Sequence, residues 1–466
     1  TGNARRPVVP EGIVRGRIGR TCLGEQGLTS IGGWSLGMND TTYTEFTNKV
    51  HGQQAGRRAP LEVSIEVTRR CPLECLHCYN NLPMGDSNAR AQELTLEEHC
   101  KLLDELSAAG CLWLCYTGGE IFARKDFLNI YTEAKKRGFL ITLFTNGTLI
   151  TPKIADYLTE FRPFSIEITL YGATRETYEA LTQVPGSYDR CMRGIRLLLE
   201  RNLPLKLKTV PTKINKHEVY EMKRMAEEDF KVDFKFDSAL NPRIDCSQSP
   251  IEVRLTPEDA VALDYFDPRR KSEYHQLLQR LLSEPVRPLS SVQGRYACGG
   301  GQSGCAIDPV GTMTICVISH QQGYNIREGS FQEGWDGPLR EIRQQKRTRP
   351  SICDQCQIRS SCGMCAATAE LENGDAESPV AFLCEVAHMR AYALGFEVPA
   401  HGDECSCCKG GARHDEIMAA AERIRERTTD PGSWSGNGSY QPALNVLQSS
   451  GGCGSGGCGS CTAHAE

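Results

Sequence analysis

The sequence predicts an α/β fold, in which a partial (β/α)6 TIM-like barrel precedes a small cysteine-rich domain and a flexible Gly/Ser/Cys tail. Six short apolar segments alternate with helical segments between residues 61 and 237, which is typical of a parallel sheet covered by helices. Six such units are too few for the closed eight-stranded barrel, so an open or partial barrel is expected. Glycine and cysteine are frequent from about residue 291, and glycine and serine from about residue 430.

Each strand-like segment is a short apolar run, and the helical segments carry recognisable start and stop signals. We expect strands at 61–67, 111–117, 139–145, 164–170, 205–210 and 232–237. We expect helices at 95–110, 126–138, 151–161, 188–202, 217–229 and within 257–283. The helix at 95–110 has the clearest ends, because Thr95 and Glu98 form a capping box and Gly110 is a stop signal. The active site of such a fold is expected at the carboxyl ends of the strands.

The composition excludes several classes of protein. Of the 466 residues 39% are hydrophobic and 24% charged, which is ordinary for a soluble globular chain. A formal net charge of −5 gives no general attraction to nucleic acid or anionic membrane. No apolar run approaches the ~18–20 residues of a membrane span, and the first residues lack the apolar stretch of a secretory signal. We therefore expect a cytoplasmic protein without a nucleic-acid or membrane partner.

Cysteine is the unusual feature, with 23 residues bunched into short-spaced groups. Disulfides are rare in a reducing compartment, so clustered cysteines there are interpreted first as metal or iron–sulfur ligands. Four others lie in apolar or amphipathic runs and are expected to be small core residues: Cys100, Cys111, Cys115 and Cys191. Cys22 and Cys246 stand alone and receive no role.

The first group is 71-CPLECLHC-78, which follows the first strand and contains Cys71, Cys75 and Cys78. Three thiolates can hold three irons of a 4Fe–4S cluster and leave the fourth iron without a protein ligand. An open metal position is what catalysis needs, whereas structural sites are closed. A zinc site would require His77, but His77 is adjacent to Cys78, and neighbouring side chains on one loop rarely converge on one metal.

A C-x3-C-x2-C loop after the first strand of a half-barrel resembles the radical S-adenosylmethionine (SAM) superfamily, over about residues 61–290. In that family the amino and carboxylate groups of SAM chelate the open iron. An electron from the cluster then cleaves SAM to methionine and a 5′-deoxyadenosyl radical. The resemblance implies that His77 occupies the aromatic position of the loop, whose backbone lies beside the adenine of SAM.

The stretch 116-YTGGEIF-122 follows the second strand and supports the resemblance. Its two glycines, Gly118 and Gly119, let a ligand approach the backbone closely. Glu120 can accept hydrogen bonds from an ammonium group. The resemblance implies that these three residues bind the amino group of the methionine moiety, whereas alone they would be an ordinary strand-to-helix turn.

Further SAM contacts are implied around the next three strands. Asn146, in the turn after the third strand, corresponds to a position near the ribose. At the end of the fourth strand Thr169 keeps the hydroxyl of relatives, whereas Tyr171 replaces an acid. Lys208 and Asn215, around the fifth strand, are candidates for the carboxylate and the adenine. The alternatives are a solvated lysine and a helix cap.

One further residue, Arg243, follows the sixth strand. It can face the cavity or pair on the surface. No catalytic acid or base is assigned.

A second cysteine block contains eight residues, with C-x2-C-x5-C-x2-C at its centre. Eight thiolates suffice for two closed 4Fe–4S clusters or for two all-cysteine zinc sites, so spacing alone does not choose the metal. The block resembles a SPASM domain, the twin-cluster module that follows the half-barrel in peptide-modifying radical SAM enzymes. The resemblance implies one auxiliary cluster on Cys298, Cys305, Cys316 and Cys365. It implies a second on Cys353, Cys356, Cys362 and Cys384.

Val317 stands where the sulfatase-maturing branch of that family has a proton-accepting acid, so formylglycine formation is disfavoured. Asp308 is an acid nearby, and a turn Asp before Pro309 is the alternative to a functional role. The expected domains are an N-terminal extension or docking element at 1–60 and a radical SAM core at 61–290. A SPASM domain at 291–408 and a helix with a flexible tail at 409–466 follow.

Two cysteine groups remain without an assignment. The segment 405-CSCC-408, with Cys405, Cys407 and Cys408, is either a redox or metal-handling patch or a set of disordered thiols. The tail cysteines stand among glycines: Cys453, Cys458 and Cys461. Such a segment cannot bury a core. It is a plain tail, a spare metal-binding arm, or a substrate-like segment that folds back.

These observations together predict a radical SAM/SPASM enzyme with three 4Fe–4S clusters, of which one binds SAM. Its substrate is expected to be a peptide or protein, modified for instance by a thioether or carbon crosslink. A flavodoxin- or ferredoxin-type electron donor is the expected partner. The alternatives are a radical SAM enzyme acting on a small-molecule cofactor precursor, a non-catalytic iron–sulfur electron carrier and a structural zinc protein.

Overall fold

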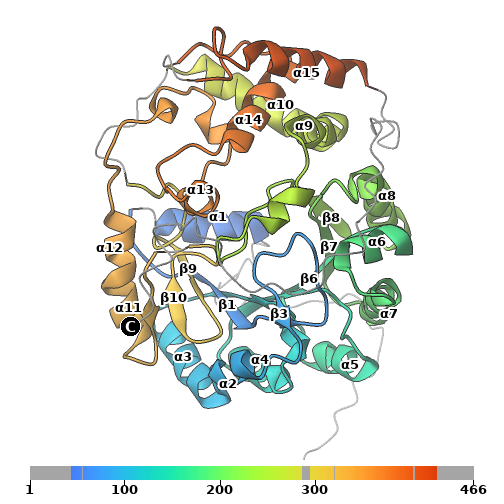
Figure 1. Ribbon diagram of the computed structural model, residues 1–466. Coiled ribbons are helices and arrows are strands. Elements are labelled where there is room, and N and C mark those ends of the chain that lie inside the picture. The colour runs from blue at the N-terminus through green and yellow to red at the C-terminus, as the bar shows by residue number, and fades with distance from the viewer. Residues whose placement is uncertain (1–42, 55, 286–293, 320, 402–404, 428–466) are drawn as a thin grey trace, which may run out of the picture. The chain divides into compact units, whose positions relative to one another are not determined.

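The computed structural model describes residues 43–54, 56–285, 294–319, 321–401 and 405–427 (Figure 1). The chain divides into two compact units, Thr1–Ala55 and Gly56–Glu466. In the first unit the described element is the helix α1 (Tyr43–Gln53). The expected tail with Cys453, Cys458 and Cys461 lies outside the described residues. Everything below concerns the second unit.

The second unit is built on one nine-stranded sheet, in the order β11-β10-β9-β1-β4-β5-β6-β7-β8. Six neighbouring strands run parallel and coincide with the six expected from the sequence: β1 (Glu62–Thr68), β4 (Trp113–Gly118), β5 (Leu140–Thr145), β6 (Ser165–Thr169), β7 (Leu205–Thr209) and β8 (Asp233–Phe236). The α/β class and the partial barrel of six βα units are thereby confirmed.

The crossover helices line the outer side of these strands (Figure 1). They are α2 (Ser87–Gln92), α3 (Leu96–Ala108), α4 (Phe127–Lys136), α5 (Pro152–Glu160), α6 (Arg175–Thr182), α7 (Ser187–Glu200) and α8 (Val219–Arg224). The capping box of Thr95 and Glu98 is present at the start of α3. The expected helix at 217–229 is divided, because a 3-10 turn η2 (Lys216–Glu218) precedes α8 and a π-turn η3 (Met225–Asp229) follows it.

Alternating residues of the parallel strands form the core. Val63, Ile65 and Val67 of β1 are 0–1% exposed, as are Leu114 and Tyr116 of β4. The faces of these strands that point away from the helices carry the polar and cysteine side chains. This alternation, which has a period of two, separates the packed core from the site.

The cysteine-rich region joins the same sheet, because β9 (Gly304–Ile307) pairs parallel with β1. Two antiparallel strands extend that edge: β10 (Thr312–Thr314) and β11 (Tyr324–Asn325). A separate ribbon of β2 (Arg70–Cys71) and β3 (Leu82–Pro83) flanks the first cysteine loop. The sequence did not predict the pairing of β9 with β1, which spans more than 200 residues of chain.

Further helices follow the barrel. They are α9 (Pro257–Phe266), α10 (Pro268–Ser283), α11 (Phe331–Asp336), α12 (Pro338–Gln344), α13 (Ala366–Asn373), α14 (Ala381–Ala393) and α15 (His414–Glu426). Short 3-10 turns are η1 (Ile121–Ala123), η4 (Ser249–Val253), η5 (Ile352–Asp354) and η6 (Arg359–Ser361). The helix α14 packs against both α9 and α15. Within the described residues, none of the helices has the length and apolarity required to cross a lipid bilayer.

Candidate active site

The first cysteine loop, residues 71–78, leaves the carboxyl end of β1 and is fastened to a neighbouring helix. The backbone N–H groups of Glu74 and Leu76 donate to the carbonyls of Thr182 and Leu181, each at 3.1 Å. Both carbonyls lie at the end of α6, a helix that the sequence analysis missed. This helix therefore holds the loop in position, although its own residues carry no metal ligand.

A buried acid on β1 anchors the residues that follow the loop. The carboxylate of Glu66 accepts hydrogen bonds from Tyr79 Oη at 3.1 Å and from Asn80 Nδ2 at 2.5 Å. Burial raises the pKa of Glu66, whereas the Arg69 guanidinium and the Tyr79 hydroxyl act in the opposite direction. Sequence analysis missed this residue; a lone acid inside an apolar strand is the signal that could have identified it.

Arg243 braces the same loop from the segment after β8. Its Nη1 atom donates to Cys78 O at 3.1 Å and to Asn81 Oδ1 at 2.8 Å. It also makes a surface ion pair with Asp245, at 3.4 Å. The sequence left open whether Arg243 faces the cavity or pairs on the surface. In the structure it makes a surface pair and also contacts the backbone of Cys78.

The thiols of Cys71, Cys75 and Cys78 are close electrostatic neighbours. Burial raises the pKa of all three, and the other thiols raise the pKa of Cys75 further; for Cys71 the value is about 12. Three buried thiols that repel each other's negative charge require a cation to become thiolates. In the described part of the chain, the sulfur atoms of these three cysteines do not all lie within 4.8 Å of one another, as the ligand atoms of a single-ion site do. A multinuclear cluster fits this spacing better than one ion.

A cavity of about 350 Å³ opens beside the three thiols. Six of the residues predicted to contact SAM line it, namely His77, Gly118, Gly119, Asn146, Thr169 and Lys208, whereas Glu120 and Asn215 do not. The cavity also reaches Cys115 on β4, which the sequence placed in the core. Its size suits a small organic ligand, and the strand ends that form it are those where the fold predicts an active site.

The two glycines serve a packing role within the chain. Gly118 has φ +134°, and a Cβ there would lie 2.1 Å from Thr68 O. A Cβ on Gly119 would lie 2.3 Å from Arg69 O and 2.6 Å from Arg70 O. The sequence predicted that a ligand would approach these two glycines closely. In the structure the backbone of the segment that leads into Cys71 approaches them instead. Both glycines also line the cavity.

Glu120 is fully buried and is held by protein donors. Its Oε1 atom accepts from Thr145 Oγ1 at 2.7 Å and from Phe122 N at 3.2 Å, and its Oε2 atom accepts from Asn146 N at 2.8 Å. Burial raises the pKa of Glu120 to about 6, against the effect of these hydrogen bonds. A carboxylate has about four acceptor positions, so one position on Oε2 remains for an ammonium group.

Asn146 connects this carboxylate to the cysteine loop. Its Nδ2 atom lies 3.5 Å from Cys71 Sγ, and its Oδ1 atom accepts from Thr148 N at 2.9 Å. The backbone and the side chain of one residue therefore contact both Glu120 and a cysteine thiol. The resemblance implied that Asn146 lies near the ribose of SAM. It did not imply the contact between Asn146 and Cys71, which the structure shows.

Two aromatic rings form a wall next to the thiols. The rings of His77 and Tyr171 are 5.1 Å apart, and Tyr171 also packs on Tyr178 at 5.5 Å. Burial lowers the pKa of His77 to about 4, so the ring is neutral, and its Nδ1 atom is buried without a hydrogen-bond partner. The Tyr171 hydroxyl hydrogen-bonds to the Cys75 thiol and thereby opposes the rise in the pKa of that thiol caused by burial. Tyr171, at a position where the resemblance implied an acid, thus contacts a cysteine of the loop.

Lys208 reaches the opposite side of the cavity. Its Nζ atom is 3.0 Å from the centroid of the Phe144 ring and 3.2 Å from Glu167 Oε2. Burial lowers the pKa of Lys208, although Glu167 acts in the opposite direction. The lysine is therefore no freely solvated side chain, and it places a partly buried positive charge beside the cavity.

Asn215 is buried and uses its amide within the protein. Its Nδ2 atom donates to Tyr171 O at 3.1 Å, and its Oδ1 atom accepts from Thr212 N at 2.7 Å. Asn215 is the N-cap residue of η2, as the helix-cap alternative predicted, although its side chain makes no capping bond. Asn215 instead fixes the backbone of the neighbouring aromatic residue.

The segment after β10 brings the cysteine-rich region to the cavity. Val317 lines the cavity directly after Cys316, so no acid occupies that place. Asp308 accepts from Val310 N at 3.0 Å and from Thr312 N at 2.8 Å. The turn interpretation of Asp308 is therefore confirmed.

The structure brings together three of the four cysteines predicted for the first auxiliary cluster. The thiol of Cys316 has Cys365 and Cys298 as electrostatic neighbours. Cys305 lies apart from them, because it belongs to β9, is buried, and has Cys111 and Arg58 as neighbours. In the structure, therefore, Cys305 is held in β9 by its pairing with β1 and is not a neighbour of the other three thiols.

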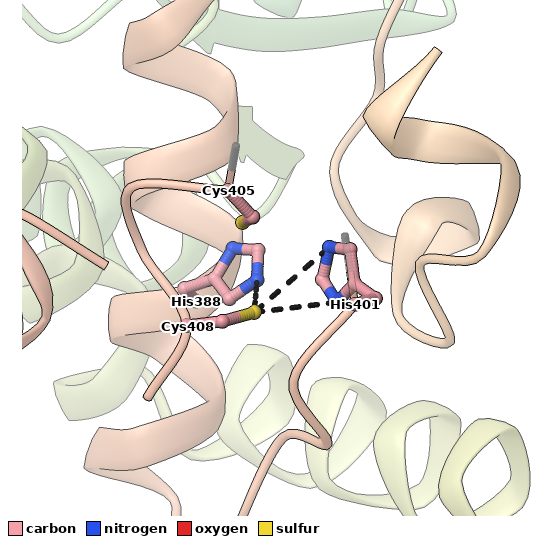
Figure 2. A group of neighbouring side chains, drawn as sticks. All are labelled: His388, His401, Cys405 and Cys408. Carbon is pink, nitrogen blue, oxygen red and sulfur yellow. Dashed lines mark hydrogen bonds between the residues drawn. The ribbon is translucent and has the colours of Figure 1, made fainter. Parts of the chain in front are cut away.

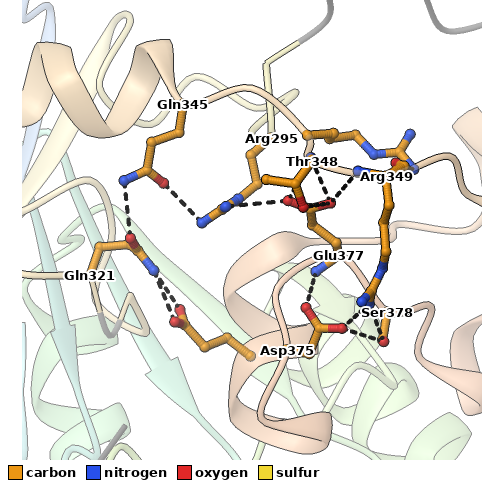
Figure 3. A network of polar contacts seen from close by, with 10 residues as sticks. Arg295, Gln321, Gln345, Thr348, Arg349, Asp375, Glu377 and Ser378 are labelled. Carbon is orange, nitrogen blue, oxygen red and sulfur yellow. Dashed lines mark hydrogen bonds and ion pairs between the residues drawn. The ribbon is translucent and has the colours of Figure 1, made fainter. Parts of the chain in front are cut away.

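A cavity of about 480 Å³ adjoins Cys298, Cys365 and Cys353. A polar network holds its walls together (Figure 3). Glu377 accepts from Arg295 Nη2 at 3.2 Å and from Thr348 N at 2.9 Å. Three segments that are distant in sequence are therefore tied into one frame around these thiols.

The second predicted auxiliary set is likewise brought together in part. The thiol of Cys362 has Cys353 and Cys356 as electrostatic neighbours. Cys384 lies instead beside Cys405 and Cys407, whose thiols raise its pKa together with burial. The 405-CSCC-408 segment, which the sequence left open, is therefore an ordered and buried part of the structure.

Comparison with known proteins agrees with this geometry. The family model of the radical SAM superfamily matches residues 65–226, and that of the iron–sulfur cluster-binding SPASM domain matches residues 298–357. The AdoMet-dependent heme synthase of Methanosarcina barkeri is 27% identical over 335 residues, 68% of this chain and 94% of that protein. The mycofactocin maturase MftC of Mycobacterium tuberculosis is 26% identical over 337 residues, 67% of this chain and 80% of that protein.

The structure of Streptococcus suis SuiB bound to the precursor peptide SuiA has the same fold. It is 18% identical, with a TM-score of 0.54, and the match covers 76% of this chain and 84% of SuiB.

Proposed function

Because this chain belongs to the radical SAM superfamily and carries a SPASM domain, we propose that it modifies a peptide or protein by hydrogen abstraction. The observation that carries this proposal is the cavity in which Cys71, Cys75 and Cys78 face the residues predicted for SAM. Three buried thiols suit an iron–sulfur cluster with one open iron, and the unpartnered Nδ1 atom of His77 suits a ligand in the cavity. Together, cluster and SAM supply a 5′-deoxyadenosyl radical that abstracts hydrogen.

The residues of the chain divide the binding of SAM among them. Cys71, Cys75 and Cys78 hold the cluster, and Glu120 presents a carboxylate to the amino group. Gly118 and Gly119 keep the end of β4 against the loop, so the distance between cluster and amino-acid site is fixed. The neutral His77 ring and Tyr171 give the adenine an apolar wall.

Thr169 and Lys208 complete the proposed SAM site. Thr169 offers a hydroxyl at the end of β6. Lys208 supplies a positive charge for the SAM carboxylate, and it would exchange part of its contact with Glu167 for that ligand. A partly buried charge that already has a partner stays ordered before the ligand arrives.

A peptide substrate is supported by the wall of the cavity and by the relatives. Val317 of the cysteine-rich region and Leu240 and Asn241 after β8 line the cavity opposite the strands. A substrate that enters there lies between the barrel and the proposed SPASM domain at 291–408, next to the core at 61–290. Mycofactocin maturase MftC is named as a maturase, and SuiB was solved with a precursor peptide.

The auxiliary cysteines are proposed to hold electron-transfer clusters. Cys298, Cys316 and Cys365 would hold one cluster, and Cys353, Cys356 and Cys362 the other, with Cys305 and Cys384 as the fourth ligands that the resemblance implies. A closed cluster next to Val317 would accept the electron that remains on the substrate after hydrogen abstraction. The reductant would be a flavodoxin- or ferredoxin-type donor in the cytoplasm.

A small-molecule precursor is the second candidate substrate. It is favoured by one observation, the match to an AdoMet-dependent heme synthase over 94% of that protein. The cavity of about 350 Å³ leaves limited room for SAM and a macrocycle together, which favours a peptide chain entering from outside.

The test uses reconstituted protein, reductant and SAM with either a precursor peptide deuterated at one side chain or a porphyrin precursor. The proposal predicts deuterium in 5′-deoxyadenosine and a mass change in the peptide, both detected by mass spectrometry. The Cys75→Ser variant should abolish both signals, and the matched Cys100→Ser variant should retain them. Turnover of only the small molecule would contradict the peptide substrate and leave the radical chemistry intact.

A further inference from the structure

The radical chemistry leaves one compact group of metal-binding side chains without a function. His388 lies on α14, His401 lies in the connection after it, and Cys405 and Cys408 belong to the CSCC segment. Each residue contributes one ligand atom, these atoms all lie within 4.8 Å of one another, and all four residues are buried (Figure 2). Two thiols and two imidazoles therefore converge on one point inside the protein.

The two histidines approach this point differently: His388 presents Nε2 to the sulfur of Cys408, whereas both ring nitrogens of His401 lie near that sulfur, Nδ1 at 3.2 Å and Nε2 at 3.9 Å. The Nδ1 atom of His388 lies 2.9 Å from Cys384 O, and the Nδ1 atom of His401 lies 3.1 Å from Pro399 O. We assign the proton to Nδ1 in both rings, since a backbone carbonyl can only accept. Each Nε2 atom then carries a free lone pair. Histidines that ligate a metal usually donate their other N–H to a carbonyl or a carboxylate in this way.

The distances fit a tetrahedral ion. The sulfur of Cys408 is 3.4 Å from His388 Nε2 and 3.9 Å from His401 Nε2. In a tetrahedral zinc site with ordinary Zn–S and Zn–N lengths, a sulfur and a nitrogen ligand are about 3.6 Å apart. The observed distances lie on either side of this value, so an ion can be inserted with small side-chain movements.

We propose that His388, His401, Cys405 and Cys408 bind a single zinc ion in a closed, structural site. Two thiolates and two imidazoles in tetrahedral arrangement are the ligand set that zinc prefers. With four protein ligands no position remains for substrate. This site is separate from the three thiols at residues 71–78 and does not depend on the proposed radical reaction.

A 4Fe–4S cluster is less suitable for this group. Each of its protein ligands binds a different iron, so the ligand atoms lie farther apart than those that share one ion. Cys384, His388 and Cys407 form a second group within 4.8 Å, but it has only three members. It would also need His388 Nδ1, which already donates to Cys384 O. The Cys2His2 group is therefore the better metal site.

The ion would fasten the connection between α14 and α15. This connection is held by Gly411 N donating to Cys408 O at 2.8 Å and by Arg413 N donating to Ser406 O at 2.8 Å. A Cβ on Gly411 would lie 2.3 Å from Cys405 O, so the chain crosses itself closely here. Such a segment has little apolar surface of its own, and a metal supplies the stability that a core would otherwise give.

His401 also contacts the thiol of Cys356, a predicted ligand of the second auxiliary cluster. The zinc ion would thus hold a wall of that cluster site without belonging to it. Loss of zinc is expected to loosen this wall, whereas the SAM-binding loop at residues 71–78 should keep its iron.

The experiment uses the full chain, purified without chelators and with its clusters reconstituted. Zinc and iron are counted by mass spectrometry, and the zinc X-ray absorption edge, which iron does not obscure, gives the ligand shell. We expect one zinc per chain, with two sulfurs at about 2.3 Å and two nitrogens at about 2.0–2.1 Å. Cys408→Ser should lower the zinc content at least about tenfold.

Two further variants make the test independent of misfolding. Cys407→Ser changes the neighbouring buried cysteine of the same segment and should retain zinc. His401→Cys converts the site to three sulfurs and one nitrogen, which zinc also accepts, so it should retain zinc and show a third sulfur.

Several results would overturn the site. Zinc below about a tenth of an equivalent in the unaltered protein would do so. Loss of zinc in Cys407→Ser together with its retention in Cys408→Ser would also do so. An unchanged number of sulfur ligands in His401→Cys, or a Cys408→Ser variant that loses iron but keeps zinc, would contradict the site as well. Failure of the radical reaction would leave these measurements unaffected, so the two proposals can fail separately.

Discussion

The Nδ2 atom of Asn146 lies 3.5 Å from the Sγ atom of Cys71, while the backbone N–H of the same residue donates to Glu120 at 2.8 Å. One side chain thereby couples the proposed cluster to the proposed site for the SAM amino group. A hydrogen bond to a ligating sulfur stabilises the more negative, reduced cluster and so raises its reduction potential.

We therefore expect Asn146→Leu to lower the reduction potential of the SAM-binding cluster by tens of millivolts, where ~59 mV is a tenfold change for one electron. An electron paramagnetic resonance titration measures this potential. Asn81→Leu, at an amide that lines the cavity and contacts Arg243, is the control and should leave the potential nearly unchanged. An equal shift in both variants would contradict the role of Asn146.

Gly119→Ala is expected to disturb the cysteine loop. The new methyl group would lie 2.3 Å from Arg69 O and 2.6 Å from Arg70 O, so the segment before Cys71 must move. Overpacking of this kind costs about 1–3 kcal/mol of unfolding free energy. We expect a lower thermal midpoint and less iron per chain. Gly85→Ala, where a Cβ would meet nothing within 4 Å, should change neither quantity.

The affinity for SAM is expected to fall as the pH decreases through about 6. Burial raises the pKa of Glu120 to about 6, so the carboxylate that would bind the ammonium group loses its charge below that pH. Calorimetric titration with SAM between pH 5 and 8 measures this dependence. Glu120→Gln should bind more weakly and show no inflection near pH 6; an inflection that persists in this variant belongs to another group.

The same raised pKa has a consequence for stability. Folding favours the protonated carboxyl of Glu120. Its contribution to the free energy of unfolding is therefore fully present at a pH below 4.5, the ordinary pKa of a glutamate. That contribution is lost as the pH rises through about 6. Bound SAM should offset this loss, because it binds the ionised form.

The buried ion pair between Arg390 and Asp264 should be important for the attachment of α14. The two side chains are 9% and 4% exposed and 2.6 Å apart, and they connect α14 with α9. Asp264→Ala leaves a buried guanidinium without its partner, which costs about 3–5 kcal/mol. Chemical denaturation measures this loss. Glu273→Ala, which breaks an exposed pair with Arg269, should cost at most about 1 kcal/mol.

Local patterns were sufficient to predict the strands, the capped helix α3 and the loop with Cys71, Cys75 and Cys78. Each of these depends on residues that are close in sequence. The helix α6 was missed because it has only eight residues and few of them are apolar, although Thr174 is a regular N-cap and Tyr178 and Leu181 form a buried face.

The positions of Cys305 and Cys384 could not be predicted for a different reason. Cys305 follows Cys298 at a distance typical of ligands, yet it lies in a strand that pairs with β1. Cys384 was assigned to the second auxiliary cluster by the resemblance, and in the structure its thiol also has Cys405 and Cys407 as neighbours. Pairing between distant segments leaves no local pattern, so such neighbours could not be read from one sequence.

The most direct test of the account measures 5′-deoxyadenosine after the anaerobically reconstituted protein is reduced and mixed with SAM. We predict its formation by the unaltered chain and by Cys100→Ser, and a loss of at least about a thousandfold in Cys75→Ser, because two thiolates cannot hold the open cluster. Absence of 5′-deoxyadenosine from the reconstituted protein, or its undiminished formation by Cys75→Ser, would contradict the central claim.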